Sequence, residues 1–334
     1  MKGTYWSYAL NRVIQAVIVI LLAYILTFVV VSILPGDPVT NILDNPENGF
    51  TPAQIHEIIA AQGLDQPIPV QLWHSLSHFL IGDFGTSMRA NLPVTTLIAN
   101  VLPSTLALAA LALVVALLLA FVIAIGTQLL PASYGQNLLR GFPSLFLSVP
   151  SFVVGLLIIH FFGFGLGLFR VIDPNSFFAT LFAAIALGIP ISAQISALLI
   201  ANLDHETNEE YAFVARSRGV SSVRLFLFHL LKPSSLSVVS ILAIIIGELL
   251  GGSVITETVF ARTGVGSLVQ STVSTQDLPV LQAIVSLAAT VFVVVNLFAD
   301  LAYPLLDPRI SLERKSSKGH PRIKAPTSAT FAQR

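Results

Sequence analysis

No cysteine occurs in the 334 residues of this chain, which excludes disulfide bonds, zinc–thiolate centres and a cysteine nucleophile. Charge is almost as scarce, because charged residues make up 10% of the chain whereas soluble domains carry roughly 25%. Hydrophobic residues instead make up 54%, and the mean hydropathy is +0.83. The composition therefore favours a membrane protein that is stabilised by packing within lipid.

A nucleotide-binding loop is also absent from the sequence. The pattern Gly-x-x-x-x-Gly-Lys-Ser/Thr, whose backbone amides hold phosphates, does not occur, and Lys never follows Gly. His160 and His205 stand without a matching set of nucleophile or metal partners. We therefore expect no ATPase site, no other enzyme activity and no cofactor in this chain.

Long apolar runs are the main positive feature of the sequence. Each has about the 20 residues that a helix needs to cross a bilayer. The first run, from Val13 to Leu34, is too long for the core of a signal peptide and is interpreted as an uncleaved span. The sequence thus predicts an all-α integral membrane protein with about six transmembrane helices, near 10–34, 103–128, 144–166, 178–201, 235–256 and 280–304.

The distribution of basic residues predicts the orientation of these spans. Lys and Arg gather in the N-terminus, the second-to-third loop, the fourth-to-fifth loop and the C-terminal tail. The opposite side holds only Arg89, Arg170 and Arg262. Because short loops rich in Lys and Arg stay in the cytoplasm, both termini are predicted to be cytoplasmic.

The segments between the runs suggest a simple organisation. An external loop with short helices is expected, one of them beginning at Thr51 and ending at Gly63. The tail is rich in Ser, Lys and Pro and is predicted to be disordered, with membrane lipid as a possible contact of its basic charge. The expected divisions are 1–34 (N-terminal segment and first span), 35–102 (external loop), 103–306 (five-helix core with a cytoplasmic loop at 202–233) and 307–334 (tail).

Two histidines of the external loop have the spacing of metal ligands. His74 and His78 are four residues apart and would share one face of a helix. No carboxylate or thiolate is clearly joined to them in the sequence. An amphipathic helix that covers the spans explains the pair adequately, and we expect no metal site.

The cytoplasmic loop at 202–233 carries signals for short helices. Thr207 and Glu210 are spaced as a capping box, in which the Thr hydroxyl accepts from a backbone amide and the Glu side chain reaches back. Gly219 stands where a left-handed residue commonly follows the end of a helix. A second helix is predicted from about 221 to Pro233, which would return the chain to the membrane.

The first of these predicted helices has an apolar face and a basic end. Tyr211, Val214 and Ala215 are expected to share one face at helical spacing. Arg216 and Arg218 place positive charge near the C-terminal end, where it is favourable. On spacing alone, a plain polar hairpin between two spans remains the alternative.

The string from Glu210 through Gly219 to Pro233 resembles the EAA loop of ATP-binding-cassette (ABC) importer permeases, whose short helix docks in a groove on the ATP-binding subunit. Further blocks, in order along nearly the whole chain, resemble signatures of the dipeptide and oligopeptide permease family, whose relatives include nickel importers. These blocks are Leu34-Pro35-Gly36-Asp37-Pro38, Gly63-Leu64-Asp65-Gln66-Pro67, Gly82-Asp83-Phe84-Gly85-Thr86-Ser87, Glu257-Thr258-Val259-Phe260 and Leu306-Asp307-Pro308-Arg309.

The resemblance implies a type I importer permease fold in the bacterial inner membrane. It also implies a second homologous permease subunit, two ATP-binding subunits and an extracytoplasmic solute-binding protein as partners, with no nucleic acid. Peptides or similar small solutes are the expected cargo. Dipeptides, oligopeptides, opines, sugars and nickel or other metal chelates all remain open.

Contact with the ATPase is implied for a set of residues in the loop. Arg216 and Arg218 would pair with acidic groups, while Tyr211 and Val214 would supply apolar contact. Two stretches depart from the family pattern: Tyr211-Ala212-Phe213 is bulkier than usual, and Ala261-Arg262-Thr263-Gly264 replaces an aromatic-Pro-Gly turn. The full set of coupling residues is Glu210, Tyr211, Val214, Ala215, Arg216, Arg218 and Gly219.

A few polar residues within the predicted spans are candidates for the translocation pathway. Ionisable groups are costly in hydrocarbon, so Glu248 and Asp300 are expected to face protein or water. Ser192 and Gln194 in the fourth span either line the pathway or satisfy backbone carbonyls near a proline. A different class, an ion-coupled secondary transporter, would use Glu248 or Asp300 as a proton or sodium site and would need no ATPase.

Overall fold

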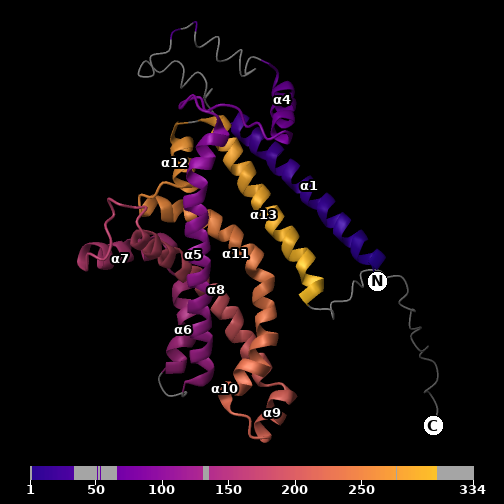
Figure 1. Ribbon diagram of the computed structural model, residues 1–334, viewed down its shortest axis with the longest axis vertical. Helices are drawn as coiled ribbons and strands as arrows, with labels where there is room; N and C mark the ends of the chain where they lie inside the picture. The colour runs from indigo at the N-terminus through magenta and orange to yellow at the C-terminus, as the bar shows by residue number, and fades with distance from the viewer. Residues whose placement is uncertain are drawn as a thin grey trace, which may run out of the picture.

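The computed structural model describes residues 2–33, 51, 53, 66–130, 135–275 and 277–306. Within this part the chain is helical apart from turns, connecting segments and an isolated bridge between Thr86 and Pro93. The elements are α1 (Lys2–Ile33), α4 (Ile68–Leu80), α5 (Val94–Leu129), α6 (Gly135–Leu147), α7 (Ser151–Ile158), the π-helix η2 (Ile159–Gly165), α8 (Phe177–Thr207), α9 (Glu210–Ser217), α10 (Ser222–Leu225), the π-helix η3 (Phe226–Leu230), α11 (Leu231–Val259), α12 (Val265–Thr275) and α13 (Leu278–Leu306), all shown in Figure 1.

The predicted membrane spans are present among the described residues. Four unbroken helices are long and apolar enough to cross a bilayer: Ala9–Val30 within α1, all of α5, all of α8, and Leu278–Phe298 within α13. Two bent pairs pass the same test, Gly135–Leu147 with Ser151–Gly165 at 108° and Ser222–Val239 with Ile244–Val259 at 60°. With each bent pair counted as one broken span, the described chain has the six spans that the sequence predicts.

The third predicted span, 144–166, is not the single helix that its hydropathy suggests. α6 ends at Leu147, and α7 begins only at Ser151, after Pro150 in extended geometry with φ −58° and ψ 137°. Proline has no amide hydrogen with which to continue the preceding helix, and it suits the start of the next one. The apolar run is therefore divided: α6 runs beside α5, and α7 crosses toward the side of the molecule (Figure 1).

The core lies where α5 and α8 pack along each other. Alanines at intervals of four on α5, from Ala112 to Ala124, are almost completely buried against the small residues of α8. At Gly188 of α8, an added Cβ would lie 2.9 Å from the backbone oxygen of Ala112. Small residues commonly allow such close approach of helices in lipid. Van der Waals packing then drives their association, because the hydrophobic effect does not act between helices there.

Helices α1 and α13 lie side by side at the edge of the molecule (Figure 1). Side chains such as Leu22 and Leu26 on α1 and Phe298 on α13 are exposed, as expected for surfaces in contact with lipid. The start of α1 and the end of α13 lie at the same end of this pair. The expected helix that begins at Thr51 and the tail 307–334 fall outside the described residues, apart from Thr51 and Ala53.

Candidate functional site

The short helix α9 projects at one end of the molecule, between α8 and α10 (Figure 1). Ala212 is completely buried and Ala215 is 9% exposed, and both join the main apolar core. Phe213 is 72% exposed and Val214 is 47% exposed. The two alanines thus allow the helix to sit closely on the protein, while the larger apolar side chains point outward.

This arrangement changes the face that the sequence predicts. Ala215 was grouped with Tyr211 and Val214, yet it packs inward beside Ala212, three residues earlier on the same face. The outward surface consists of Tyr211, Phe213 and Val214, with Glu210, Arg216 and Arg218 also exposed. Phe213 is the most exposed of the three apolar side chains, and the sequence analysis did not predict its exposure.

The predicted left-handed cap of α9 is confirmed. Gly219 has φ +78°, its amide donates to the Arg216 carbonyl at 2.9 Å, and the Val220 amide donates to the Ala215 carbonyl at 3.2 Å. These two hydrogen bonds form a Schellman motif, which satisfies carbonyls at the end of a helix. No atom lies within 4 Å of a Cβ added at Gly219, so the positive φ rather than crowding favours glycine there.

The predicted capping box at the start of α9 is wrong. Thr207 is the last residue of α8, and its hydroxyl donates to Gln128 Oε1 at 3.4 Å instead of capping α9. The N-cap is Glu209, in extended geometry and without a side-chain cap. Because α8 continues beyond the apolar run, the residues of the expected box fall on two different helices.

Tyr211 ties α9 back to the end of α8. Its hydroxyl donates to a carboxylate oxygen of Glu206, the residue before the last residue of α8. Burial raises the pKa of Tyr211 above its ordinary value, and the hydrogen bond to Glu206 raises it further. The phenol therefore stays protonated and keeps its role as donor.

The second predicted helix of the loop begins as expected but does not end at Pro233. It starts at Ser222 as α10, passes through η3 and continues into α11. Leu225, Phe226 and Leu230 of this segment are buried in the same core as Ala212 and Ala215. α9 therefore sits on the beginning of the fifth span as well as on the end of the fourth.

The predicted pathway residues lie in different environments. Ser192 is completely buried and donates to the Ile189 carbonyl at 2.6 Å, Gln194 is half-buried, and Glu248 is exposed on α11. The side chain of Asp300 lies outside the described part of the structure. The pathway role of Ser192, Gln194 and Glu248 stays a prediction.

A second carboxylate of α11, Glu257, is completely buried near the C-terminal end of this helix. Its Oε1 accepts from the Thr105 hydroxyl at 2.6 Å, and its Oε2 accepts from the amides of Gly266 at 2.7 Å and Ser267 at 3.3 Å. The Thr105 oxygen also accepts from the Val265 amide at 2.8 Å. Glu257 thus binds the start of α12, where negative charge is favourable, and joins α12 to α5.

The signature block at 82–87 forms a tight turn. Asp83 accepts from the Gly85 amide at 2.9 Å and lies 2.8 Å from His78 Nδ1, and these two contacts lower the pKa of Asp83, the Gly85 amide most. Ser87 donates to the buried carboxylate of Asp277, directly before α13. The rings of His74 and His78 lie 4.3 Å apart, but no group of three or more metal-ligating side chains occurs among the described residues.

Comparison with known proteins decides which family this arrangement represents. The profile of "Binding-protein-dependent transport system inner membrane component" matches residues 116–312, and the profile of the corresponding N-terminal part matches residues 6–109. The chain is 32% identical over 305 residues to the glutathione transport system permease protein GsiC of Salmonella typhimurium LT2, covering 91% of this chain and 98% of the relative. It is 31% identical over 305 residues to GsiC of Escherichia coli K12, with the same coverage.

The chain belongs to this family of binding-protein-dependent inner membrane components.

Membership in the family confirms the main expectations from the sequence. The protein is a permease subunit of an ABC importer, and it is a multi-pass protein of the inner membrane. As a transport component it works with ATPase and binding-protein subunits. The family favours this function over the ion-coupled transporter that the sequence left open.

The structure of this binding-protein-dependent component also shows residues that sequence reasoning missed. Phe213, Glu206 and the Arg140–Asp204 pair lie at the α9 end, and Asp277 lies near α12. Glu257 stood inside a quoted signature block, but nothing local in the sequence indicates that its carboxylate binds Thr105, 152 positions earlier.

Proposed function

We propose that this chain forms half of the translocation pathway of an ATP-driven importer of short peptides or peptide-like solutes. In this proposal α9 docks in a groove of an ATP-binding subunit. Displacement of α9 tilts the spans, so that the translocation pathway opens to each side of the membrane in turn. A second permease subunit supplies the other half of the pathway. Two ATP-binding subunits supply the energy, and a solute-binding protein delivers the cargo.

The exposed face of α9 is the observation that carries this proposal. Phe213 and Val214 present apolar surface at the tip of the molecule, flanked by the exposed cations Arg216 and Arg218. Exposed apolar groups beside charges are typical of a surface that binds another protein. The buried alanines on the opposite face and the bond from Tyr211 to Glu206 join α9 firmly to the spans, as a lever requires.

The proposed cargo comes from the named relatives. GsiC of both organisms is named for glutathione transport, and glutathione is a small peptide. At this level of identity the fold and the mode of transport are shared more securely than the cargo. We therefore propose peptide-like solutes as the class, with glutathione as the first compound to test.

The proposed orientation places α9 and both termini in the cytoplasm. The beginning of α1 and the end of α13 lie at one end of the molecule's edge, and their helices run toward α12 and α4 at the other (Figure 1). This geometry supports the orientation that the basic residues predict. The natural absence of cysteine allows single cysteines at Ser217 and Ser271 to be labelled with an impermeant maleimide, which should react from the cytoplasmic and external sides, respectively.

The exposed face of α11 supports a shared pathway. Ile244, Glu248, Gly251 and Ile255 recur at helical spacing on this face, and all are exposed in the single chain. A carboxylate in a span is costly against lipid, so this face is expected to meet water or a second permease subunit. We propose that Glu248 lines the pathway there and that Ser192 and Gln194 lie behind it.

The test is uptake by the complete importer in proteoliposomes, prepared from this chain with its second permease, ATPase and binding-protein subunits. Wild type should take up labelled glutathione or peptide only when ATP is supplied. Phe213→Asp with Val214→Asp should abolish uptake and co-purification of the ATPase subunits, because charge replaces the apolar contact. Ser271→Asp, an exposed substitution on α12, serves as the control and should retain both.

Solute uptake by the purified chain without ATPase subunits would refute the proposal. Unchanged co-purification in the Phe213→Asp/Val214→Asp protein would refute the docking surface. A further variant, Ala215→Glu, places a charge in the core beneath α9 and should reduce the amount of folded protein. This variant shows the effect of disrupting the buried face of α9, as distinct from its docking face.

A further inference from the structure

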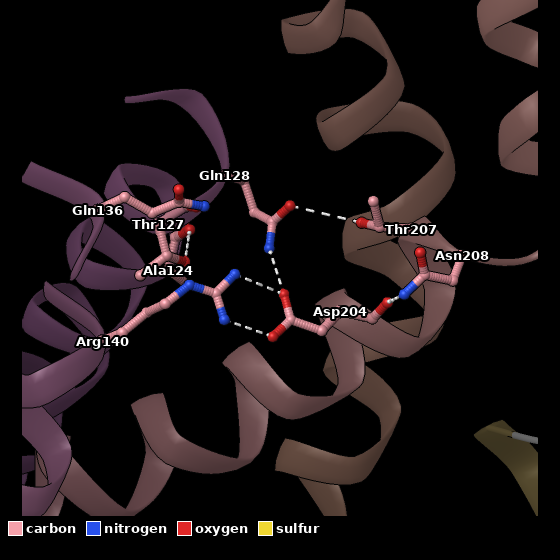
Figure 2. Close-up of polar contacts among 8 residues, drawn as sticks. All are labelled: Ala124, Thr127, Gln128, Gln136, Arg140, Asp204, Thr207 and Asn208. Atoms are coloured by element: carbon pink, nitrogen blue, oxygen red, sulfur yellow. Dashed lines mark hydrogen bonds and ion pairs between the residues drawn. The ribbon is translucent and has the colours of Figure 1, made fainter. Parts of the chain in front are cut away.

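A charged cluster joins the ends of three helices close to α9 (Figure 2). Arg140 of α6 and Asp204 of α8 form a two-pronged ion pair, with Nη1 to Oδ2 at 2.6 Å and Nη2 to Oδ1 at 2.8 Å. Both side chains are about one-third exposed, at 35% and 39%. This parallel geometry restricts the relative position of the two helices more than a single contact does.

The cluster extends to α5 through an amide. Gln128 Nε2 donates to Asp204 Oδ1 at 3.2 Å, and Gln128 Oε1 accepts from the Thr207 hydroxyl at 3.4 Å. Gln136 Nε2 donates to the Thr127 carbonyl at 2.7 Å, which joins the last turn of α5 to the first turn of α6. Figure 2 shows the side chains of Arg140 and Gln128 converging on the Asp204 carboxylate.

Asp204 lies in the last turn of α8, close to the link between α8 and α9. α8 ends at Thr207, and only Asn208 and Glu209 separate it from α9. Asn208 Nδ2 donates to the Asp204 carbonyl at 2.8 Å, so the link itself is bonded to the residue that holds Arg140. Displacement of α9 therefore acts directly on this turn of α8, as it does on the beginning of the fifth span through α10.

The polar contacts connect this turn of α8 to α5 and α6. Without them, α6 would be held to α8 by apolar packing, which permits sliding of one helix along another more readily than a directional ion pair does. A partly exposed ion pair contributes little to stability in general. The value of such a pair lies in the geometry that it imposes.

We propose that Arg140 and Asp204 are positioning residues that make α5, α6 and α8 follow α9 as one body during the transport cycle. The inference rests on the proposed docking of α9 on an ATPase subunit. The pair touches neither ATP nor cargo; it determines how much of the α9 displacement reaches the spans.

The first test measures cargo taken up for each ATP hydrolysed by the complete importer in proteoliposomes. Asp204→Ala and Arg140→Ala should lower this ratio by about two- to thirty-fold, the range found for substitutions along a coupling network. ATP hydrolysis should continue, because the docking face of α9 is unchanged. The exchange Arg140→Asp with Asp204→Arg should recover most of the ratio, since Gln128 can turn its amide to bind either charge.

A matched control lies one residue away. His205 is exposed and lies 3.7 Å from Glu209, the N-cap of α9, and no contact of its side chain with α5 or α6 is found among the described residues, so His205→Ala should leave the ratio unchanged. Should Asp204→Ala fail to reach the membrane, Asp204→Asn keeps one acceptor oxygen for Arg140 and should give an intermediate ratio.

The second test measures the relative motion of α6 and α9 directly. Spin labels on cysteines at Leu138 and Ser217, both exposed in a chain without native cysteine, report the separation of the two helices. In wild type the distance distribution should stay single and narrow with and without ATP. In Asp204→Ala it should broaden or shift when ATP is added.

The outcomes separate this inference from the proposed function. Absence of ATP-driven uptake in wild type would refute the importer itself. Normal uptake by wild type together with an unchanged ratio in Asp204→Ala, or with α6 and α9 moving apart in wild type, would overturn only the role of the pair. A parallel loss of uptake and hydrolysis that the charge exchange does not restore would also overturn it.

Discussion

Replacement of the buried carboxylate Glu257 should destabilise the packing of α12 on α5 and α11. In Glu257→Leu, the buried amide of Gly266 and the part-buried amide of Ser267 lose their acceptor. The Thr105 hydroxyl can turn to a carbonyl of its own helix, so only the two amides are counted. An unpaired buried group costs about 1–3 kcal/mol, which is the loss expected from the Gly266 amide, and the part-buried Ser267 amide adds less.

The conservative variant should show an intermediate effect. Glu257→Gln keeps one oxygen for the two amides but loses the charge, and hydrogen bonds to charged groups are roughly twice as strong as neutral ones. We expect a loss of about 1–2 kcal/mol. Gly264→Ala should resemble the leucine variant, because its Cβ would lie 2.2 Å from the carboxyl carbon of Glu257.

The assay is thermal unfolding of the full-length chain in detergent, followed by helical circular dichroism. Glu248→Leu is the matched control, since Glu248 lies on the same helix, is exposed, and has no hydrogen-bond partner within the described part of the chain. The expected order of melting temperature is wild type and Glu248→Leu, then Glu257→Gln, then Glu257→Leu. Equal melting temperatures for the two leucine variants would show that the reasoning about the buried amides is wrong.

Two further predictions concern local structure. Gly219→Ala forces a residue with a Cβ into the left-handed region at a cost of about 1 kcal/mol. Hydrogen exchange of the Val220 amide should therefore become about fivefold faster, with Gly219→Asn in between. An unchanged rate would contradict the cap. Ser87→Ala leaves an oxygen of the buried Asp277 without its hydroxyl donor and should destabilise by about 1–3 kcal/mol. The exposed Ser271→Ala should change the melting temperature little, and an equal effect of the two serine variants would refute the proposed difference.

Features that depend on nearby residues were predictable from the sequence. A span must present about 20 apolar residues to lipid whatever it packs against, so the runs within α1, α5, α8, α11 and α13 could be recognised without a fold. The cap at Gly219 is equally local, because positive φ at the end of a helix favours glycine by its own backbone sterics.

Local patterns failed where neighbouring helices compete for the same residues. Thr207 and Glu210 have capping-box spacing but form no box, because α8 continues through Thr207, and Arg140 and Gln128 bind its last turns. Periodicity likewise predicts one apolar face on α9, with Tyr211, Val214 and Ala215 on it. Which face is buried depends on the size of the gap beneath the helix, and that gap admits Ala212 and Ala215.

The sequence by itself determined that this protein lies in the membrane, that it has six long apolar segments, and that a short capped helix follows the fourth of them. Only the tertiary structure decided that Asp204 meets Arg140, 64 positions away, and that Glu257 meets Thr105, 152 positions away. The physical reason is range. Hydropathy and backbone sterics act over a few residues, whereas a buried charge is satisfied by whichever donors the packed helices bring to it.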